Sequence, residues 1–374
     1  MKKFLLITGS LLVILFTITT FTGTNYLYKA LWYFTADIDD YKIFDNRTVD
    51  AGVSQPIPQS SFFNSKQPSA ELNSLLEKTS SVALLVLKND SVLFEKYWKG
   101  YSDSSYSNSF SVAKTIVGLL TAMAVKDGFI KSLDESIGNF LPEFSEGDKS
   151  KITVRSLLMM SSGSNWDESY SSPFSTTTEA YYGWDLYKVA TGVNAEKTPG
   201  TEWRYKSGDT ELLALVLEKA TGKSLSVYAS EKLWKPLGAQ HAALWSLDKK
   251  EGREKAYCCF NSNARDFSRI GTLFLHYGNW QGVQLLDSSV IELFTSPLSM
   301  NDTENKTADY YGYQLWRLPD REGVFYARGI LGQYIIVVPQ KNVVVVRLGE
   351  HRGEIVRHSF EEVYALVDWA LKDL

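Results

Sequence analysis

The sequence predicts an α+β fold: one antiparallel sheet built from both chain ends, flanked by helices, with a helical lobe inserted between its two halves. Three observations support this arrangement. Strand-like sequence begins at residue 81, similar sequence returns between residues 310 and 350, and the stretch between them has helical periodicity. A sheet must bury an apolar face, so we expect the terminal helices to cover it.

The first strands are predicted by the stretch "VALLVLKNDSVLFEKYW" at residues 82–98. Two runs rich in β-branched and aromatic residues surround the pair Asn89-Asp90, which is the pattern of a β-hairpin. Near the C-terminus, further strands are predicted by "YYGYQLWRL", "GVFYARGILGQYIIVVPQ" and "NVVVVRLGE", with a turn at residues 339–342. We expect these strands to join the hairpin in a single sheet.

Helices are predicted between these strands and at the C-terminus. Most of the internal segments end at a glycine, as helix C-termini commonly do; they are "SVAKTIVGLLTAMAVKDG", "ITVRSLLMMSSG", "GDTELLALVLEKATG" and "ARDFSRIGTLFLHYG". The last stretch, "FEEVYALVDWALKDL", places apolar residues at helical spacing. A helical lobe therefore separates the two halves of the predicted sheet.

The composition indicates a folded protein and excludes nucleic-acid binding. Of the 374 residues, 44% are hydrophobic and 13% aromatic, which is enough for a sizeable core. The net charge is -4 and no run of Lys or Arg exceeds two, so no basic footprint is present. The only cysteines, Cys258 and Cys259, are adjacent, a spacing that rarely permits a disulfide and does not fit a metal site. We expect two buried apolar thiols, and no cofactor is indicated.

The N-terminus has the features of a membrane-targeting segment. Lys2 and Lys3 precede an apolar run from Phe4 to Phe21, about long enough to cross a ~30 Å hydrocarbon core as a helix. We predict an uncleaved anchor, with a cleaved signal peptide as the alternative, because no small-x-small cleavage site is evident. Both place the body outside the cytoplasm, periplasmic or extracellular, and cleavage would make it secreted.

Three regions are predicted along the chain. Residues 1–24 form the membrane anchor or signal segment. Residues 25–75, where Pro, Ser and Gln are frequent and no periodicity persists, form a tether and lead-in. Residues 76–374 form the main domain.

The short motif "SFSVAKT", at residues 109–115, places Ser111 and Lys114 three positions apart. Residues at this spacing share a helix face, with Cβ atoms about 5–6 Å apart, so the hydroxyl and the amine can meet. The helix is apolar on nearly all sides, which indicates burial, and desolvation would lower the pKa of the lysine and provide a neutral amine as a base. The alternative is a capping serine followed by a lysine that reaches solvent.

A second motif, Tyr205-Lys206-Ser207, stands just before another predicted helix in "EWRYKSGDTELLALVLEKATG". With both motifs in this order, the chain resembles the penicillin-recognising serine hydrolases. That family has a β-lactamase/transpeptidase-like fold and includes class C β-lactamases, D,D-peptidases, esterases and amidases. The resemblance covers residues 75 to about 370, including "LLMMSSGSNWDE" and "EKLWKPLGA". It is greatest for the branch that contains 6-aminohexanoate-dimer hydrolase and related carboxylesterases.

The resemblance implies catalytic roles at the matching positions. Ser111 would be the nucleophile, Lys114 its activating base, and Tyr205 a phenol that relays the proton to and from the leaving group. A serine hydroxyl is a poor nucleophile without a nearby base, and Lys and Tyr can act as that base without histidine. The alternative for Tyr205 is a residue that only packs.

The third motif departs from the family pattern. Ala327-Arg328-Gly329 stands where a β-lactamase has Lys-Thr-Gly or Lys-Ser-Gly. Gly329 still permits a close backbone approach, and the amide of Ile330 could join that of Ser111 in an oxyanion hole. Recognition of a β-lactam carboxylate is in doubt without the Lys-Thr pair. Arg328 is either a substitute anion clamp or a solvated strand residue.

Two more residues are candidates for substrate binding. Ser207 would either hydrogen-bond the substrate or cap the helix that begins at Gly208. Tyr170, beside "NWDES", corresponds to a loop tyrosine in relatives that hydrolyse linear amides, where it would steady the leaving nitrogen. The alternative for Tyr170 is a surface tyrosine.

Taken together, the motifs predict an exported serine hydrolase that cleaves an amide or ester bond through an acyl-enzyme. Its substrate would be a small molecule or a short peptide-like amide or ester. One alternative is D,D-peptidase or β-lactamase activity. The other is a non-hydrolytic, membrane-tethered sensor of cell wall or penicillin, which the predicted anchor and the altered third motif suggest.

Overall fold

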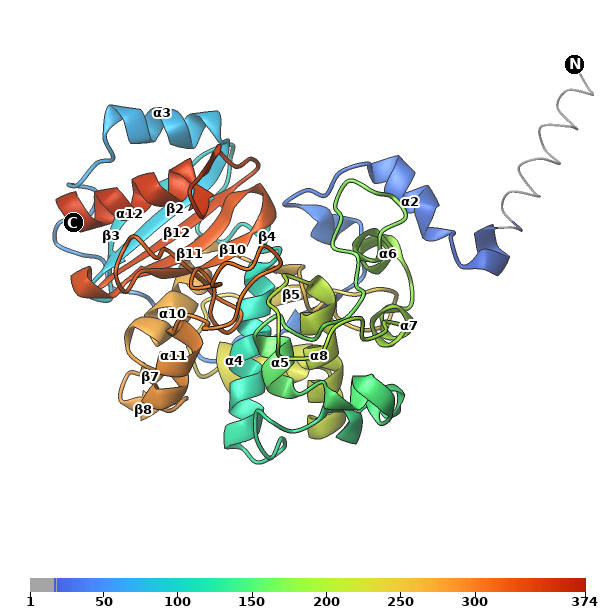
Figure 1. Cartoon of the computed structure of the whole chain (residues 1–374). Helices are drawn as coiled ribbons and strands as arrows, with labels where there is room; N and C mark the ends of the chain where they lie inside the picture. The colour runs from blue at the N-terminus through green and yellow to red at the C-terminus, as the bar shows by residue number, and fades with distance from the viewer. Residues whose placement is uncertain (1–16, 18) are drawn as a thin grey trace, which may run out of the picture.

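The computed structural model describes residue 17 and residues 19–374, and it contains a six-stranded antiparallel sheet. The strand order is β3-β2-β12-β11-β10-β9, so strands from the two chain ends pair in one sheet (Figure 1). The strands are β2 (Ser81–Lys88), β3 (Ser91–Tyr97), β9 (Trp316–Arg317), β10 (Phe325–Gly329), β11 (Gln333–Val338) and β12 (Val343–Gly349). The predicted fold class is confirmed.

The hairpin β2–β3 turns at the predicted pair. Asn89 and Asp90 have φ angles of 48° and 62°. Two consecutive residues with positive φ are typical of the type I′ turn, whose twist matches that of the strands, and Asn and Asp tolerate this conformation. The turn therefore fixes the pairing of Leu87 with Val92, and an irregularity between Val86 and Leu87 then shifts the register so that Val86 lies opposite Phe94.

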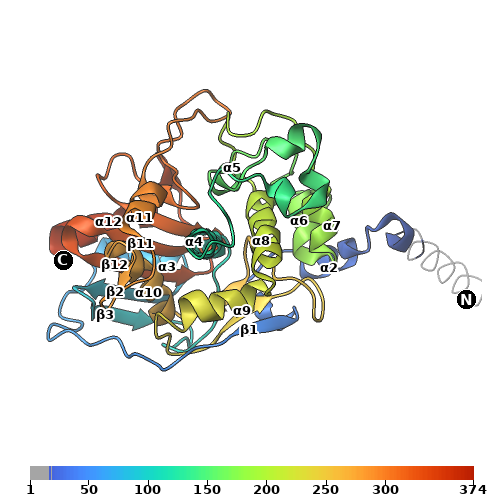
Figure 2. The same cartoon turned by 90° about the horizontal axis from the view of Figure 1, so that it is seen from below.

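The centre of the sheet is the pairing of β2 with β12, in which Val86 lies opposite Val345. Both strands are apolar along nearly their whole length and almost fully buried. Strands of this kind need cover on both faces. Helices α3 (Ala70–Lys78) and α12 (Glu361–Asp373) cover one face, and α10 (Ala264–Leu275) covers the other (Figures 1 and 2).

Helix α4 (Val112–Lys126) lies between the sheet and the helical lobe (Figure 2). It packs against β10 and β11 on one side and α8 (Ser207–Thr221) on the other, so an apolar surface all round is buried. The other helices are α5 (Val154–Leu158), α6 (Thr176–Tyr182), α7 (Leu186–Thr191), α9 (Leu225–Ala229) and α11 (Ser288–Thr295). Four short strands form two separate two-stranded sheets. In one, β7 (Asn279–Trp280) pairs with β8 (Val283–Gln284), and in the other, β13 (Ile355–Val356) pairs with β14 (Ser359–Phe360).

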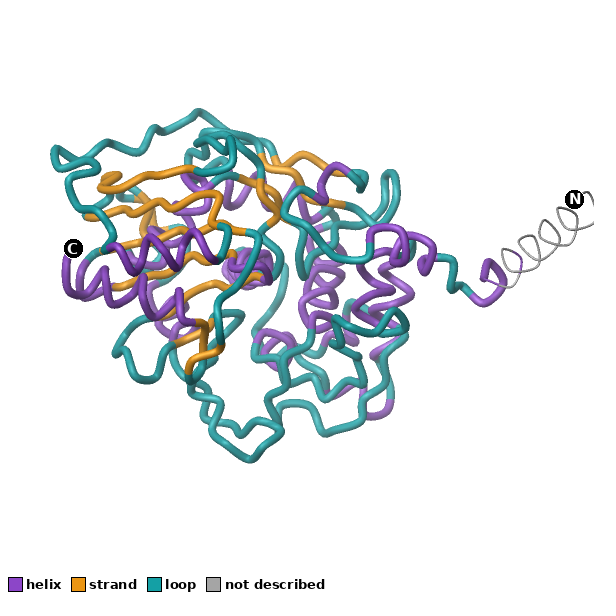
Figure 3. Tube along the Cα trace, turned by 90° about the horizontal axis from the view of Figure 1, so that it is seen from above, coloured by secondary structure: helices purple, strands orange, loops and turns teal. Residues whose placement is uncertain are grey.

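Residues 25–75 pack against the body, and their description as a tether is wrong. Strand β1 (Asn46–Val49) pairs with β5 (Ala243–Ser246) in a second sheet of order β1-β5-β6-β4, which also holds β6 (Phe260–Ser262) and β4 (Ser107–Asn108). Helix α2 (Tyr26–Tyr33) packs against α6, on the opposite side of the molecule from the C-terminus (Figure 3). A four-residue strand whose partner lies far along the chain leaves no local periodicity to detect.

The predicted anchor at residues 1–24 falls largely outside the described residues, since residues 1–16 and 18 are not among them. In the part of the chain that the structure describes, no helix combines the length and the apolar character needed to cross a membrane.

Cys258 and Cys259 are buried, as expected, but they form a disulfide with each other, so the prediction of free thiols is wrong. Cys259 has a φ of 67°, which is the left-handed conformation. The expectation that adjacent cysteines rarely form a disulfide does not take this conformation into account. The linked pair directly follows Tyr257, whose carbonyl belongs to the site described below.

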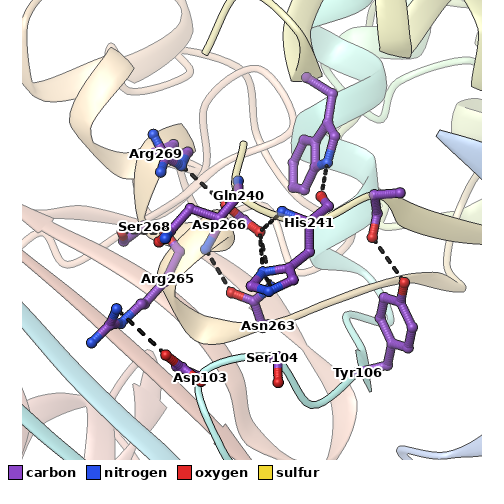
Figure 4. Close-up of polar contacts among 12 residues, drawn as sticks. Asp103, Ser104, Tyr106, Gln240, His241, Asn263, Arg265, Asp266, Ser268 and Arg269 are labelled. Atoms are coloured by element: carbon purple, nitrogen blue, oxygen red, sulfur yellow. Dashed lines mark hydrogen bonds and ion pairs between the residues drawn. The ribbon is translucent and has the colours of Figure 1, made fainter. Parts of the chain in front are cut away.

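A buried carboxylate fixes α10 to the loop that precedes β5 (Figure 4). The Asp266 carboxylate accepts hydrogen bonds from the backbone N–H groups of Gln240 (2.7 Å) and His241 (3.0 Å). It also accepts from Asn263 Nδ2 (2.9 Å) and Arg269 Nε (3.0 Å). Asp266 and Arg269 are both almost completely buried, so each charge is stabilised by the opposite charge of the other and would be costly to bury alone.

Candidate active site

A strand, a strained turn and a helix place Ser111. Strand β4 ends at Asn108, and α4 begins at Val112. Between them the buried Phe110 adopts a φ of 45°, and its N–H donates to Asn108 Oδ1 (2.9 Å). A left-handed conformation is rare for a bulky residue, and such strain is concentrated at functional sites. Ser111 makes no side-chain capping bond, so its hydroxyl is available at the N-terminus of α4.

Lys114 lies beside this hydroxyl and is buried. Its Nζ is 2.9 Å from Ser111 Oγ and donates to the carbonyl of Tyr257 at 2.8 Å. Only 2% of the residue is exposed, so the alternative of a lysine that reaches solvent is wrong. Burial lowers the pKa of Lys114 to about 8, against the charges of Glu168 and Glu211, which raise it. A neutral amine is therefore accessible near physiological pH.

Tyr205 completes the group around Ser111. Its ring centroid lies 5.1 Å from Lys114 Nζ, and the Ser111 hydroxyl is near enough to the phenol to lower the phenol's pKa in part. Burial raises the pKa of Tyr205 above its usual range, and the negative charge of Glu168 raises it further. The ring also packs against Trp316 at 5.4 Å between centroids, so Tyr205 both packs and contacts the serine.

A carboxylate that the sequence did not predict lies close to these three groups. Glu168 accepts hydrogen bonds from the backbone N–H of Ser207 (2.6 Å), from Ser207 Oγ (2.7 Å) and from the Tyr170 hydroxyl (2.6 Å). No motif marks it, because a lone acid in a loop has no spacing that links it to a helix start elsewhere in the chain. Glu168 supplies the negative charge at the N-terminus of α8 that the dipole favours.

Ser207 and Tyr170 both line a cavity that reaches Ser111. Ser207 is the first residue of α8, and its hydroxyl donates to Glu168 rather than capping the helix. Tyr170 as a whole is 56% exposed, and its hydroxyl donates to Glu168. Burial raises the pKa of the Tyr170 phenol well above its usual value, and the charge of Glu168 adds to this.

The third motif lies against the turn that carries Ser111. A β-carbon built on Gly329 would be 2.2 Å from the carbonyl oxygen of Ser109, so only glycine permits this approach. Ile330, the next residue, lines the same cavity as Ser111.

Arg328 is half-buried and does not line the cavity. Its guanidinium carbon lies 3.2 Å from the ring centroid of Trp316, in a stacked cation–π contact. Trp316 also packs on Tyr205. The positive charge of Arg328 therefore lies near the Tyr205 phenol and lowers its pKa in part.

In the described part of the chain, no group of three or more His, Cys, Asp or Glu residues could hold a metal ion. Two of the histidines lie beside carboxylates away from Ser111. His241 lies at Asp266 and His276 pairs with Asp90 at 2.7 Å. The basic side chain that contacts Ser111 is that of Lys114.

A comparison with protein-family models decides the family. The beta-lactamase model matches residues 72–365. The chain belongs to the beta-lactamase family. The prediction of a β-lactamase-related serine hydrolase is confirmed at this level, and the match begins close to the predicted start of the main domain at residue 76.

Curated relatives and solved structures agree with this assignment. The 6-aminohexanoate-dimer hydrolase of Paenarthrobacter ureafaciens is 26% identical over 306 residues, which cover 77% of this beta-lactamase-family chain and 77% of that protein. A Bacillus anthracis structure provisionally named 6-aminohexanoate-dimer hydrolase has a TM-score of 0.76 at 21% identity, with 90% of this chain and 92% of that one covered. A family VIII carboxylesterase has a TM-score of 0.65 at 14% identity, with coverages of 86% and 99%. These two structural similarities show that the chain shares the fold of those proteins.

Proposed function

We propose that this protein hydrolyses an ester or amide bond through an acyl-enzyme on Ser111, with Lys114 as the general base and Tyr205 as the proton relay. One observation carries the proposal: a lysine that is almost completely buried has its Nζ 2.9 Å from a serine hydroxyl at a helix start. That distance is within reach of direct proton transfer.

In the acylation step, neutral Lys114 takes the proton of Ser111 as Oγ attacks the substrate carbonyl carbon. The oxygen of that carbonyl becomes negatively charged, and the amides of Ser111 and Ile330 stabilise it, aided by the α4 dipole. Tyr205 passes a proton to the leaving alcohol or amine and recovers one from Lys114. Water then attacks the acyl-enzyme through the same groups, which releases the acid and restores Ser111.

Glu168 sets the charge environment of this cycle without touching the reacting atoms. Its charge raises the pKa values of both Lys114 and Tyr205, and it holds Ser207 and Tyr170 at the mouth of the site. Tyr170 is thereby oriented by a carboxylate, and we assign to its hydroxyl the role of steadying the leaving group.

An open-chain ester or amide fits this site better than a β-lactam. Among the described residues, those that line the cavity at Ser111 include no charged side chain, and a β-lactam carboxylate requires a cationic partner. Arg328 is stacked on Trp316 and lies outside the lining.

The proposal is tested with a fluorophosphonate probe and chromogenic esters on the purified full chain. Wild type should form a covalent adduct that peptide mass spectrometry places on Ser111, and it should hydrolyse the esters with repeated turnover. Ser111→Ala should lose both, while Ser109→Ala, two positions away, should keep both if it folds. Equal hydrolysis by Ser111→Ala would refute the proposal. Adduct formation without turnover would favour the non-hydrolytic sensor, and stable labelling by penicillin would favour a D,D-peptidase.

We further propose that residues 1–24 tether the enzyme to a membrane with its catalytic domain outside the cytoplasm. The support is the pair Lys2 and Lys3, which directly precede the apolar run from Phe4 to Phe21. No charged residue follows Lys3 until Lys29. Membrane fractionation with an alkaline wash should retain the full chain, and added protease should reach its body in intact cells. Leu12→Lys, in the middle of the run, should release it, whereas Thr24→Lys, beyond the run, should not. A chain found in the soluble cytoplasmic fraction would contradict the proposal.

A further inference from the structure

The cavity that opens at Ser111 has a volume of about 550 Å³. Its lining includes Ser111, Ser207 and Tyr170. The other lining residues are mainly apolar and aromatic, come from parts of the chain that are far apart in sequence, and include the polar residues Thr35, Ser171, Ser172, Thr177 and Thr178. No Asp, Glu, Lys, Arg or His is among the described lining residues, so nothing in this wall would stabilise a charged substrate group.

Three hydroxyl groups that line the rest of the cavity are engaged within the protein, whereas the buried hydroxyl of Tyr257 has no partner among the described residues and could make one hydrogen bond to a substrate. The Thr177 hydroxyl donates to the carbonyl of Asp167 (2.9 Å), and that of Thr178 donates to the carbonyl of Ser172 (2.8 Å). The Tyr181 hydroxyl donates to Asp40 Oδ2 at 2.6 Å. A substrate there gains little from hydrogen bonds and much from removing apolar surface from water.

Part of this wall comes from outside the region that matches the family. Leu31 in α2 and Phe34 just after it line the cavity, yet they are 68% and 84% exposed. Two large apolar side chains facing water at the edge of a cavity leave apolar area that a ligand can cover. Trp32, between them, is 83% exposed and does not line the cavity.

We infer that the cavity binds an uncharged hydrocarbon chain attached next to the scissile bond, and that Leu31 and Phe34 determine the preferred chain length. This inference rests on the proposed function and adds its substrate class: esters or amides with a medium-length or long apolar chain. Phe110, Ile330 and Leu331 also line the cavity and add apolar surface that the chain can cover.

The test uses the purified full chain and two series of esters. In the first series, p-nitrophenyl acetate, butyrate, hexanoate and octanoate lengthen the acyl side. In the second, acetates of ethanol, butanol, hexanol and octanol lengthen the alcohol side, with hydrolysis followed by released acid. In one of the two series kcat/KM should rise with chain length, by at most about fourfold per methylene, which identifies the side that occupies the cavity.

Variants then locate the effect on the wall. Leu31→Ser and Phe34→Ser should each lower kcat/KM for the longest good substrate about tenfold and leave that for the shortest within about twofold. Trp32→Ser is the matched control and should change neither value. All three residues are largely exposed, so the variants are expected to fold, which thermal unfolding would verify.

The outcomes separate this inference from the proposed function. If no ester is turned over and Ser111 is not labelled, the proposed function itself fails. If esters are turned over but kcat/KM falls with length in both series, the cavity does not bind a hydrocarbon chain. If the length preference exists but survives both Leu31→Ser and Phe34→Ser, the wall before residue 37 is not its source.

Discussion

Replacing Gly329 by alanine is the sharpest test of the active-site geometry. The added β-carbon would stand 2.2 Å from the carbonyl oxygen of Ser109 and 3.1 Å from the β-carbon of Phe110. An ordinary carbon–oxygen contact is about 3.3 Å, so strand β10 and the turn before Ser111 must separate by roughly 1 Å. This displacement lies between the nucleophile and the amide of Ile330, which the proposed mechanism needs together.

A misplacement of about 1 Å can cost roughly 100-fold in rate, or ~2.7 kcal/mol of transition-state stabilisation. We therefore expect Gly329→Ala to lower kcat for a chromogenic ester by about this factor, with a smaller change in KM. Overpacking should also lower the free energy of unfolding by roughly 1–3 kcal/mol, measured by urea denaturation.

The control is Gly52→Ala. Gly52 is exposed, and a β-carbon there would meet nothing closer than the side chain of Lys235 at 3.2 Å. This variant should match wild type in both measurements. A Gly329→Ala protein with wild-type kcat and stability would show that the approach of the strand to the turn has no role in catalysis, and the proposed oxyanion arrangement would have to be abandoned.

Four further outcomes are expected. For an uncharged ester, kcat/KM should rise with pH around the Lys114 pKa of about 8 and level off above it, because only the neutral amine accepts a proton. Glu168→Gln should move the rising part of the pH–rate profile to lower pH, because the Glu168 charge raises the pKa of Lys114. An unshifted profile would count against this electrostatic effect of Glu168 on Lys114. Asp266→Ala should lower the free energy of unfolding by ~3–5 kcal/mol because it leaves Arg269 buried without a partner. Asp90→Asn, which removes the charge of an exposed pair but still tolerates the positive φ of the turn, should cost at most ~1 kcal/mol; similar urea midpoints would contradict this. Intact mass spectrometry should find the unreduced protein lighter than the reduced one by two hydrogen atoms, and equal masses would exclude the Cys258–Cys259 disulfide.

The large sheet and its hairpin could be predicted because their signals are local. Val86 and Phe94 belong to runs with strong strand character, and the turn residues between them tolerate positive φ. The second sheet could not be predicted in the same way. Strand β1 is four residues long, and its partner β5 lies about two hundred residues later, so neither has a pattern of its own.

The candidate site shows the same division. Ser111 and Lys114 share one helix turn, so their contact follows from spacing alone. Tyr205 required the resemblance to a family, since nothing in its own neighbourhood links it to residue 111. Glu168 and the carbonyl of Tyr257 had no signal at all, because their roles depend only on where loops come to rest in the folded chain.

The pairing of β2 with β12 bears on how the protein is made. Strand β2 is translated early and β12 near the end, so a nascent chain exposes one apolar strand edge until its partner emerges from the ribosome. Such long-range pairing closes slowly and favours aggregation in the interval. A message cut short before residue 343 would yield a product with the entire serine–lysine motif but without the strand that completes its support.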